Sequence, residues 1–229
     1  MRLPGLLLLT ALAVRPAAAD MMLYAVDALQ SPSTDPQPAR IDAYCLRADG
    51  ALPPTPSSSI MLQSGAPRRM ILAKKAHLDD PNGPLDNDAL YVAEQGLVEG
   101  FAVGTDGKLT RLGNTKPDPG INLRGLEVAR STDGTLMLYV SEAGRDRVAG
   151  YVLDATGKPS EDPVTCIQDL AVRQIRVSRN QLFVGNGGSN GRIDVFDINA
   201  EGLLLNGTTP TTKCPNSDPI ESKNDATPV

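Results

Sequence analysis

The sequence predicts an all-β fold made of repeated units, and three observations support this. Its apolar runs are short, rich in β-branched and aromatic residues, and bounded by turn residues. The 19 Pro and 21 Gly interrupt most windows in which a helix could form. A Leu-aromatic strand recurs from Leu23, Leu90, Leu138 and Leu182, and a period near 45 residues with strand content is typical of a β-propeller or a similar array.

A second apolar strand follows each of these strands and carries one aromatic residue. The aromatic residues are spaced by 57, 50 and 45 positions, and a glycine follows each after six residues. Glycine tolerates positive φ there, so we expect a tight hairpin after each second strand, with the aromatic residue buried. The aromatic residues are Tyr44, Phe101, Tyr151 and Phe196, and the glycines are Gly50, Gly107, Gly157 and Gly202.

Each unit is expected to contain four strands, most clearly in the third unit: LRGLEVAR, TLMLYVSE, DRVAGYVLD and KPSEDPVTC. In its third strand both faces are apolar, so the sheet needs a neighbour on each side, which stacking around an axis provides. We therefore predict a β-propeller, partial or open, of about four four-stranded blades. The units are 20–65, whose inner strand is not recognisable, 66–115, 116–168 and 169–214, followed by a disordered tail at 215–229.

The first 19 residues have the pattern of a signal peptide: a basic start, an apolar run and small residues before position 20. We expect cleavage between Ala19 and Asp20, and export to the periplasm or the medium. The alternative is that this segment is a buried first strand. No other run is long enough to span a bilayer as a helix.

The formal charge is −5, and it becomes −7 once Arg2 and Arg15 leave with the signal peptide. A net acidic chain without a basic cluster does not suit nucleic acid or an anionic membrane. Three cysteines leave at least one without an intramolecular disulfide. Cys166 and Cys214 both follow the outer strand of their unit and are the favoured pair, the alternative being three thiols.

Two stretches, RGLEVARSTDGTLMLYV and LYVSEAGRDRVAGYVLDATGK, resemble the lactonase-like propellers of the 6-phosphogluconolactonase type and the broader YVTN-type repeats, over about residues 22 to 210. The absence of Trp argues against tryptophan-aspartate repeats. The resemblance implies hydrolysis of a sugar lactone. It also implies seven blades, whereas four units are present, so we expect an open arc, a fragment, or half of a ring that a second copy completes.

Aligning the units brings two sets of polar residues to one end of the blades. Acids or an amide follow the second strand, and arginines stand at the start of the first strand, although Arg68 could replace Arg69 in the second unit. These residues are expected to face one mouth of the central channel. They are Asp27, Glu94, Glu142 and Asn186 in the first set, and Arg69, Arg124 and Arg173 in the second.

Three interpretations of this mouth remain open. The acids pair with the arginines for stability, or surplus arginines bind a carboxylate or phosphate, or the oxygen ligands hold calcium, which is the only cofactor considered. His77, the single histidine, lies in an Asp-rich insertion that is more typical of a solvated loop than of a general base. We expect an exported scaffold that binds a small anion or another protein. The alternative is a sugar-lactone hydrolase, in which Arg124 and Arg173 orient the substrate and Glu142 or Glu94 activates water.

Overall fold

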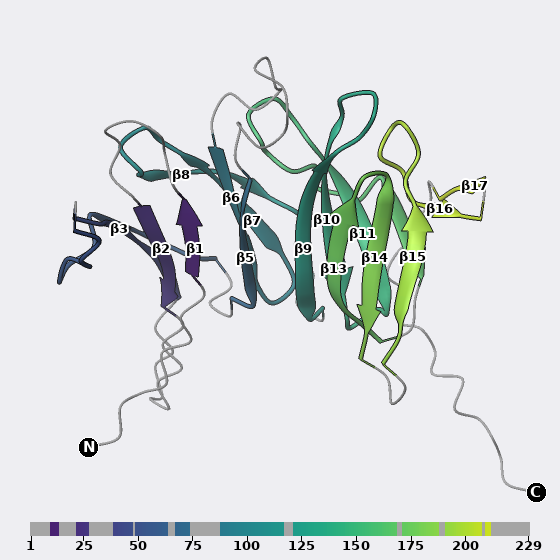
Figure 1. Ribbon diagram of the computed structural model, residues 1–229, viewed down its shortest axis with the longest axis horizontal. Helices are drawn as coiled ribbons and strands as arrows, with labels where there is room; N and C mark the ends of the chain where they lie inside the picture. Colours follow the sequence, from purple (N-terminus) through teal and green to yellow (C-terminus); the bar gives the residue numbers. More distant parts are fainter. Residues whose placement is uncertain are drawn as a thin grey trace, which may run out of the picture.

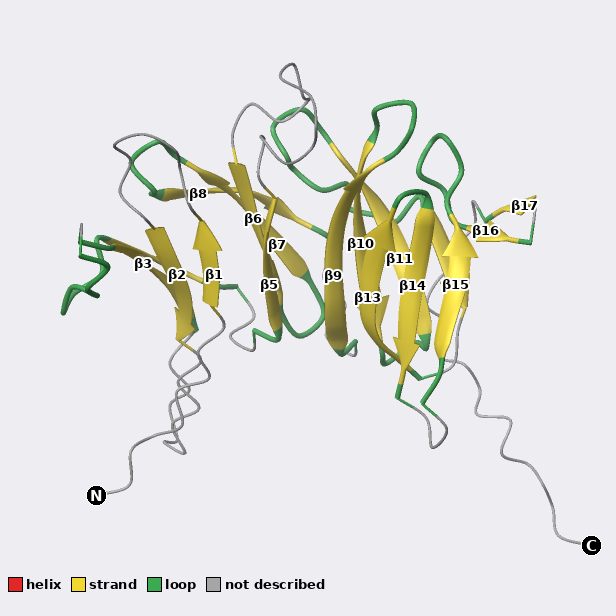
Figure 2. Ribbon diagram, in the orientation of Figure 1, coloured by secondary structure: helices red, strands yellow, loops and turns green. Residues whose placement is uncertain are grey.

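The computed structural model describes residues 10–13, 22–27, 39–47, 49–63, 67–73, 88–116, 121–168, 171–187, 191–207 and 209–211. In these ranges the chain forms β-strands joined by turns and loops, without an α-helix (Figure 2). The all-β prediction is confirmed. Four antiparallel sheets, called blades 1 to 4 in chain order, stand side by side along an open arc (Figure 1).

Within each blade the strands pair in the order in which they occur in the chain, so each blade is a meander with its first strand innermost. Blade 1 consists of β1 (Thr10–Ala13), β2 (Met22–Asp27), β3 (Arg40–Cys45) and β4 (Ser58–Met61), and blade 2 of β5 (Arg69–Ala73), β6 (Asp88–Ala93), β7 (Val98–Val103) and β8 (Leu109–Asn114). Blade 3 consists of β9 (Leu123–Arg130), β10 (Leu136–Glu142), β11 (Arg147–Leu153) and β12 (Thr165–Gln168), and blade 4 of β13 (Val172–Ser178), β14 (Gln181–Asn186) and β15 (Ile193–Asp197).

Blade 4 differs from the expected four-stranded unit, because its described sheet has three strands. The next segment forms a separate two-stranded sheet of β16 (Leu205–Asn206) and β17 (Thr209–Pro210). Just before it, the Leu204 N–H donates to Thr165 Oγ1 at 3.0 Å, and the Thr165 hydroxyl donates to the Thr211 carbonyl at 2.7 Å. These bonds attach the segment to the outer strand of blade 3, while an isolated antiparallel bridge between Leu204 and Ile198 keeps it beside the end of β15.

Blade 1 contains an inner strand, β1, where the pattern of the units showed none and where the sequence favoured a signal peptide. β1 pairs with β2 in antiparallel register, Thr10 opposite Ala25 and Ala13 opposite Met22. This strand lies inside the segment predicted to be a signal peptide. The structure thus shows the alternative arrangement for the unprocessed chain, while cleavage and export stay predictions.

The repeat alignment from sequence is confirmed by the strand register. Leu23, Leu90, Leu138 and Leu182 lie directly opposite Tyr44, Phe101, Tyr151 and Phe196, respectively. Phe101 and Tyr151 are buried between blades as predicted, whereas Tyr44 and Phe196 are half-buried.

Both faces of the central blades are apolar, and each contact between successive blades, here called a junction, has its own core. In β11, Tyr151 and Leu153 pack toward blade 2, while Val148 and Val152 pack toward blade 4. Blades 1 and 2 share a third core around Tyr24 and Phe101. Stacking therefore buries both faces, as the sequence pattern required.

One hydrogen bond repeats at every junction. The residue after the leading leucine of the second strand is a tyrosine in blades 1, 2 and 3, and its hydroxyl donates to the carbonyl of the turn glycine in the next blade. We call this contact the tyrosine–glycine bond. Burial raises the pKa of Tyr91 and Tyr139, which keeps these hydroxyls protonated as donors. The bonds run from Tyr24 to Gly107 at 3.0 Å, from Tyr91 to Gly157 at 2.7 Å and from Tyr139 to Gly202 at 2.7 Å.

Candidate functional site

Glu142, predicted at the channel mouth, is enclosed within blade 3. It ends β10 with 2% of its surface exposed, and its Oε2 lies 2.5 Å from Arg147 Nε on β11. The Tyr151 hydroxyl donates to Oε1 at 3.2 Å, and Arg145 adds a second, longer contact at 3.9 Å. The carboxylate is therefore neutralised inside its own blade, by arginines that the sequence alignment had not considered.

Glu94 is also buried, at the junction of blades 1 and 2, beside Glu99 of β7. Glu99 ion-pairs with Arg111 and accepts the Gln63 N–H at 2.5 Å. Burial, followed by a hydrogen bond with Glu94, raises the pKa of Glu99 to about 8, although Gln63 and Arg111 oppose the shift. Burial beside Glu94 therefore favours the protonated form of Glu99, and the hydrogen bond from Gln63 links this residue to blade 1.

In blade 4, the predicted ring member Asn186 contacts residues of its own blade. Asn186, at the end of β14, donates from Nδ2 to Asp194 of β15, and Asp194 also pairs with Arg192 Nε at 2.7 Å. The side chain of Asp27 lies outside the described part of the chain. Glu94, Glu142 and Asn186 thus hold equivalent places in their blades, and Glu142 and Asn186 each contact a partner in their own blade.

The predicted arginines behave differently from the acids, because they are exposed. Arg124 and Arg173 each occupy a register irregularity near the start of their inner strand, where an extra residue re-aims the side chain. In blade 2 the corresponding place belongs to Arg68, since Arg69 pairs directly with Ala93. Within the described ranges, neither Arg124 nor Arg173 has an ion-pair partner.

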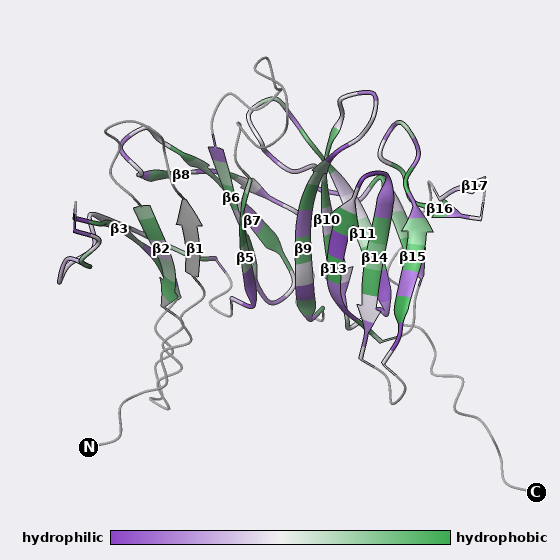
Figure 3. Cartoon of the chain, in the orientation of Figure 1, coloured by the Kyte–Doolittle hydropathy of each residue, from purple (hydrophilic) through white to green (hydrophobic). Residues whose placement is uncertain are grey.

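Close approach of β9 and β13 brings these two arginines onto neighbouring strands. The Gly125 N–H donates to Ser141 Oγ at 2.6 Å, and the Ser141 hydroxyl donates to the Arg173 carbonyl at 2.7 Å. A Cβ added at Gly125 would lie 3.0 Å from the backbone nitrogen of Ile175. Glycine is therefore needed at position 125 for the inner strands to approach this closely. Along their length, these strands alternate between polar and apolar residues (Figure 3).

Sequence reasoning missed Glu127 and Arg176, which stand at one register position of β9 and β13. Their side chains form an ion pair at 3.3 Å. Burial raises the pKa of Glu127, while Arg176 and then Arg69 oppose the shift. Glu127 thus lies under the influence of arginines from the inner strands of two neighbouring blades. No recurring pattern marks this position, because blade 2 has Ile71 there.

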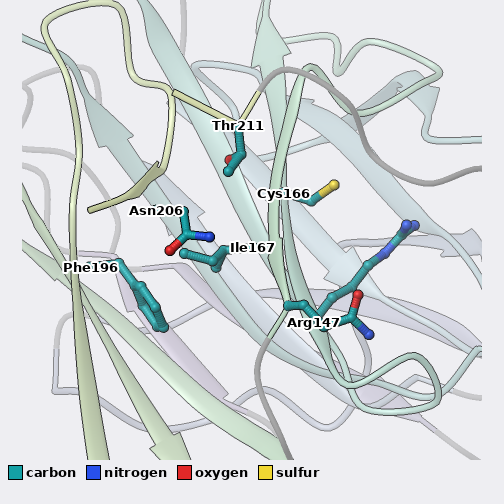
Figure 4. Close-up of a pocket in the computed structure, with 7 residues that line it drawn as sticks. Arg147, Cys166, Ile167, Phe196, Asn206 and Thr211 are labelled. Carbon is teal, nitrogen blue, oxygen red and sulfur yellow. The ribbon is translucent and has the colours of Figure 1, made fainter. Parts of the chain in front are cut away.

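A hollow of about 260 Å³ lies away from the inner strands, between the outer part of blade 3 and the segment around β16. Figure 4 shows Phe196 and Asn206 on one side and Arg147 and Cys166 on the other. The charge of Arg147 is matched by Glu142, so the lining offers amide and apolar groups in place of a net charge.

Some of the cysteine and histidine predictions fall on residues that the structure describes. Cys166 is disulfide-bonded, and Cys45 is a reduced thiol. Cys214, the predicted partner of Cys166, lies outside the described residues, as do His77 and the tail at 215–229. Over the described ranges, no group of three His, Cys, Asp or Glu side chains could hold a metal ion, so the calcium interpretation gains no support there. The same ranges contain no helix long and apolar enough to cross a membrane.

Stacked meanders with parallel inner strands define a β-propeller-type protein with an open ring. No family model matches the chain, and no curated protein matches it. Solved structures do match: a Lactobacillus plantarum protein (17% identity, TM-score 0.58, 82% of this chain and 52% of the other), and a functionally unknown protein from Desulfotomaculum acetoxidans (16%, 0.57, 86% and 54%). A third is the periplasmic gluconolactonase of Pseudomonas aeruginosa (18%, 0.53, 83% and 51%).

These similarities establish the fold, and the propeller-type resemblance seen in the sequence agrees with them. This chain spans about half the length of each of the three proteins.

Proposed function

We propose that this chain is an exported β-propeller-type binding protein whose inner strands hold a small organic anion of the sugar-acid class. The observation that carries the proposal is the pair of exposed guanidinium groups of Arg124 and Arg173. They stand on adjacent inner strands without an ion-pair partner among the described residues.

The chemistry of these residues favours a carboxylate with neighbouring hydroxyl groups. A guanidinium donates two parallel hydrogen bonds to a carboxylate or phosphate. Glu127, beside Arg176, offers acceptor oxygens for a sugar hydroxyl, and Gln174 adds an exposed amide on β13. Local positive charge in a chain of net charge −5 would attract anions to this end of the blades. The similarity to a periplasmic gluconolactonase makes gluconate the first ligand to test.

Titration calorimetry of the purified chain with gluconate and phosphogluconate tests the proposal. Arg124→Ala and Arg173→Ala should each weaken binding by roughly 10-fold or more, the effect of losing a charge-assisted hydrogen bond. Both variants should keep their thermal stability. Arg47→Ala is the matched control, because Arg47 is an exposed arginine in the β3–β4 turn, at the opposite end of the blades. Failure of both ligands to bind, or an equal loss in the control, would contradict an inner-strand site.

Hydrolysis of a sugar lactone is the second candidate, and the position of Glu127 favours it. Glu127 is the acid of the described inner strands, its pKa is raised, and Arg69 and Arg176 influence it. Such a carboxylate would take a proton from water as the water oxygen attacks the lactone carbonyl, and an arginine would stabilise the oxyanion. The ring C–O bond would then break, and the departing oxygen would regain a proton.

Titrimetric assay of gluconolactone hydrolysis separates the two candidates. Turnover by wild type above the spontaneous rate, lost in Glu127→Gln, would support catalysis. Absence of turnover together with gluconate binding would leave the binding function alone. Export is tested separately by mass spectrometry of the protein recovered outside the cytoplasm, whose chain should begin at Asp20.

A further inference from the structure

The tyrosine–glycine bond is present at all three junctions, but its donor is missing from blade 4. Phe183 follows the leading Leu182 of β14, at the place of Tyr24, Tyr91 and Tyr139. Its ring lies on the face of blade 4 that points away from blade 3, because Leu182 and Val184 on the other face belong to the blade 3–4 core. Blade 4 therefore has a phenylalanine ring, Phe183, at the junction position where the other blades have a tyrosine with a hydroxyl donor.

Blade 1 presents the complementary acceptor. Gly50 has φ of 78° and donates its N–H to the Arg47 carbonyl at 2.8 Å, as Gly107, Gly157 and Gly202 do in their own turns. Met22 and Met137 of the preceding blade crowd Gly107 and Gly202, whereas no described atom lies within 4 Å of a Cβ placed on Gly50. The turn that receives a preceding blade is thus formed and uncovered.

The exposed apolar residues of blade 4 also occupy junction positions. Ile193 corresponds by register to Ile41, Val98 and Val148. Those three are 0%, 1% and 0% exposed, while Ile193 is 70% exposed. Val195, opposite Phe183, is 49% exposed. Phe183, Ile193 and Val195 are called the blade 4 face, and this is the surface that a following blade would bury.

Blade 1 carries the matching surface on its outer side. Leu23, Ala25 and Tyr44 stand where Leu138, Val140 and Tyr151 of blade 3 pack against blade 2. Leu23 and Tyr44 are half-buried, Ala25 is buried and Met61 of β4 is 47% exposed, and these four residues are called the blade 1 face. The two ends of one chain therefore carry the two halves of a junction that the chain already builds three times.

We infer that the blade 4 face of one copy docks on the blade 1 face of a second copy, so that two copies close an eight-bladed ring. A head-to-tail contact yields a closed ring when its rotation closes and a filament when it does not. Two copies of four blades make eight, a blade number that is known for propellers. In a two-fold arrangement, the blade 4 face and the blade 1 face of both copies are covered. The absent Phe183 hydroxyl makes this junction weaker than the internal ones.

Sedimentation velocity over a wide concentration range tests the ring. The purified chain of 24.2 kDa should sediment as a reversible dimer. Phe183→Tyr should restore the bond to Gly50 at both junctions and tighten the dimer on the order of 5- to 150-fold, from roughly 0.5–1.5 kcal/mol for each hydrogen bond. Ile193→Asp should give a monomer whose melting temperature at low concentration is unchanged.

Ala155→Asp is the matched control, because it adds the same charge at an exposed turn of blade 3 and should remain dimeric. A wild-type chain that stays monomeric at about 100 μM overturns the inference, as does a dimer that Ile193→Asp leaves intact. Growth beyond two copies overturns ring closure. These results do not depend on gluconate binding, so this inference and the proposed function fail separately.

Discussion

Replacing Glu142 by Gln tests whether this residue serves stability or chemistry. Glutamine keeps the size of the side chain and can still accept a hydrogen bond, so the change removes mainly the charge. Arg147, only 6% exposed, then loses the carboxylate at 2.5 Å, and the longer-range Arg145 has the same sign. Breaking a buried ion pair costs about 3 to 5 kcal/mol because one charge stays buried alone.

We expect about 3 kcal/mol of lost stability in urea unfolding, the lower end of that range, since Arg145 and the blade edge admit some solvent. For a chain of this size the melting temperature should fall by about 6 to 12 °C. Adding Arg147→Met to Glu142→Gln should recover most of the loss, because the unmatched charge is then removed. Glu161→Gln, at an exposed position, should change stability by less than about 0.5 kcal/mol.

A Glu142→Gln variant as stable as wild type, but unable to bind or hydrolyse a sugar-acid ligand, would refute this reasoning. It would return Glu142 to the catalytic role considered from the sequence.

Three further predictions concern the junctions between blades. Tyr139→Phe should cost about 1 to 2 kcal/mol in urea unfolding, because it leaves the buried Gly202 carbonyl without its donor, and an unchanged stability would contradict the role of the tyrosine–glycine bond. Glu99 has its pKa raised from 4.5 to about 8, so the folded state binds the extra proton and stability should fall as pH rises from about 5 to 8; unfolding at several pH values should show a shallower fall in Glu99→Gln. Gly125→Ala should cost about 1 to 3 kcal/mol, since the new methyl group meets Ile175 at 3.0 Å, and a neutral result would mean that β9 and β13 can separate freely.

The blade positions were predictable because they depend on features that recur. Each leading leucine, such as Leu138, is followed by an aromatic residue and pairs with the same aromatic position in every unit, so alignment of the units predicted the strand register. That the described sheet of blade 4 lacks a fourth strand was not predictable in this way. Its segment is held by Thr165 of blade 3, a contact between distant parts of the sequence.

The candidate site was harder to predict for the opposite reason. Glu127 and Arg176 occupy one register position, where blade 2 has Ile71, so the position changes in chemistry from blade to blade. A search for repeated polar residues finds Glu94 and Glu142, whose shared place turned out to be buried. Charged residues at positions that differ between units, such as Glu127 and Arg176, can be recognised as neighbours only from the assembled structure.

Strand β1 lies in the segment that we propose to be a signal peptide, and the two roles are incompatible. Paired with β2, Thr10–Ala13 is part of a sheet. If the segment is a leader, as we propose, the same residues must instead pass unfolded to the export machinery and to a peptidase that would cut before Asp20. A chain that folded before export would hold its leader in hydrogen-bonded register, where neither could engage it. Slow pairing of β1 with β2, or a chaperone that delays it, would favour secretion. If the chain is exported as proposed, the order of folding and export would decide whether blade 1 keeps four strands or three.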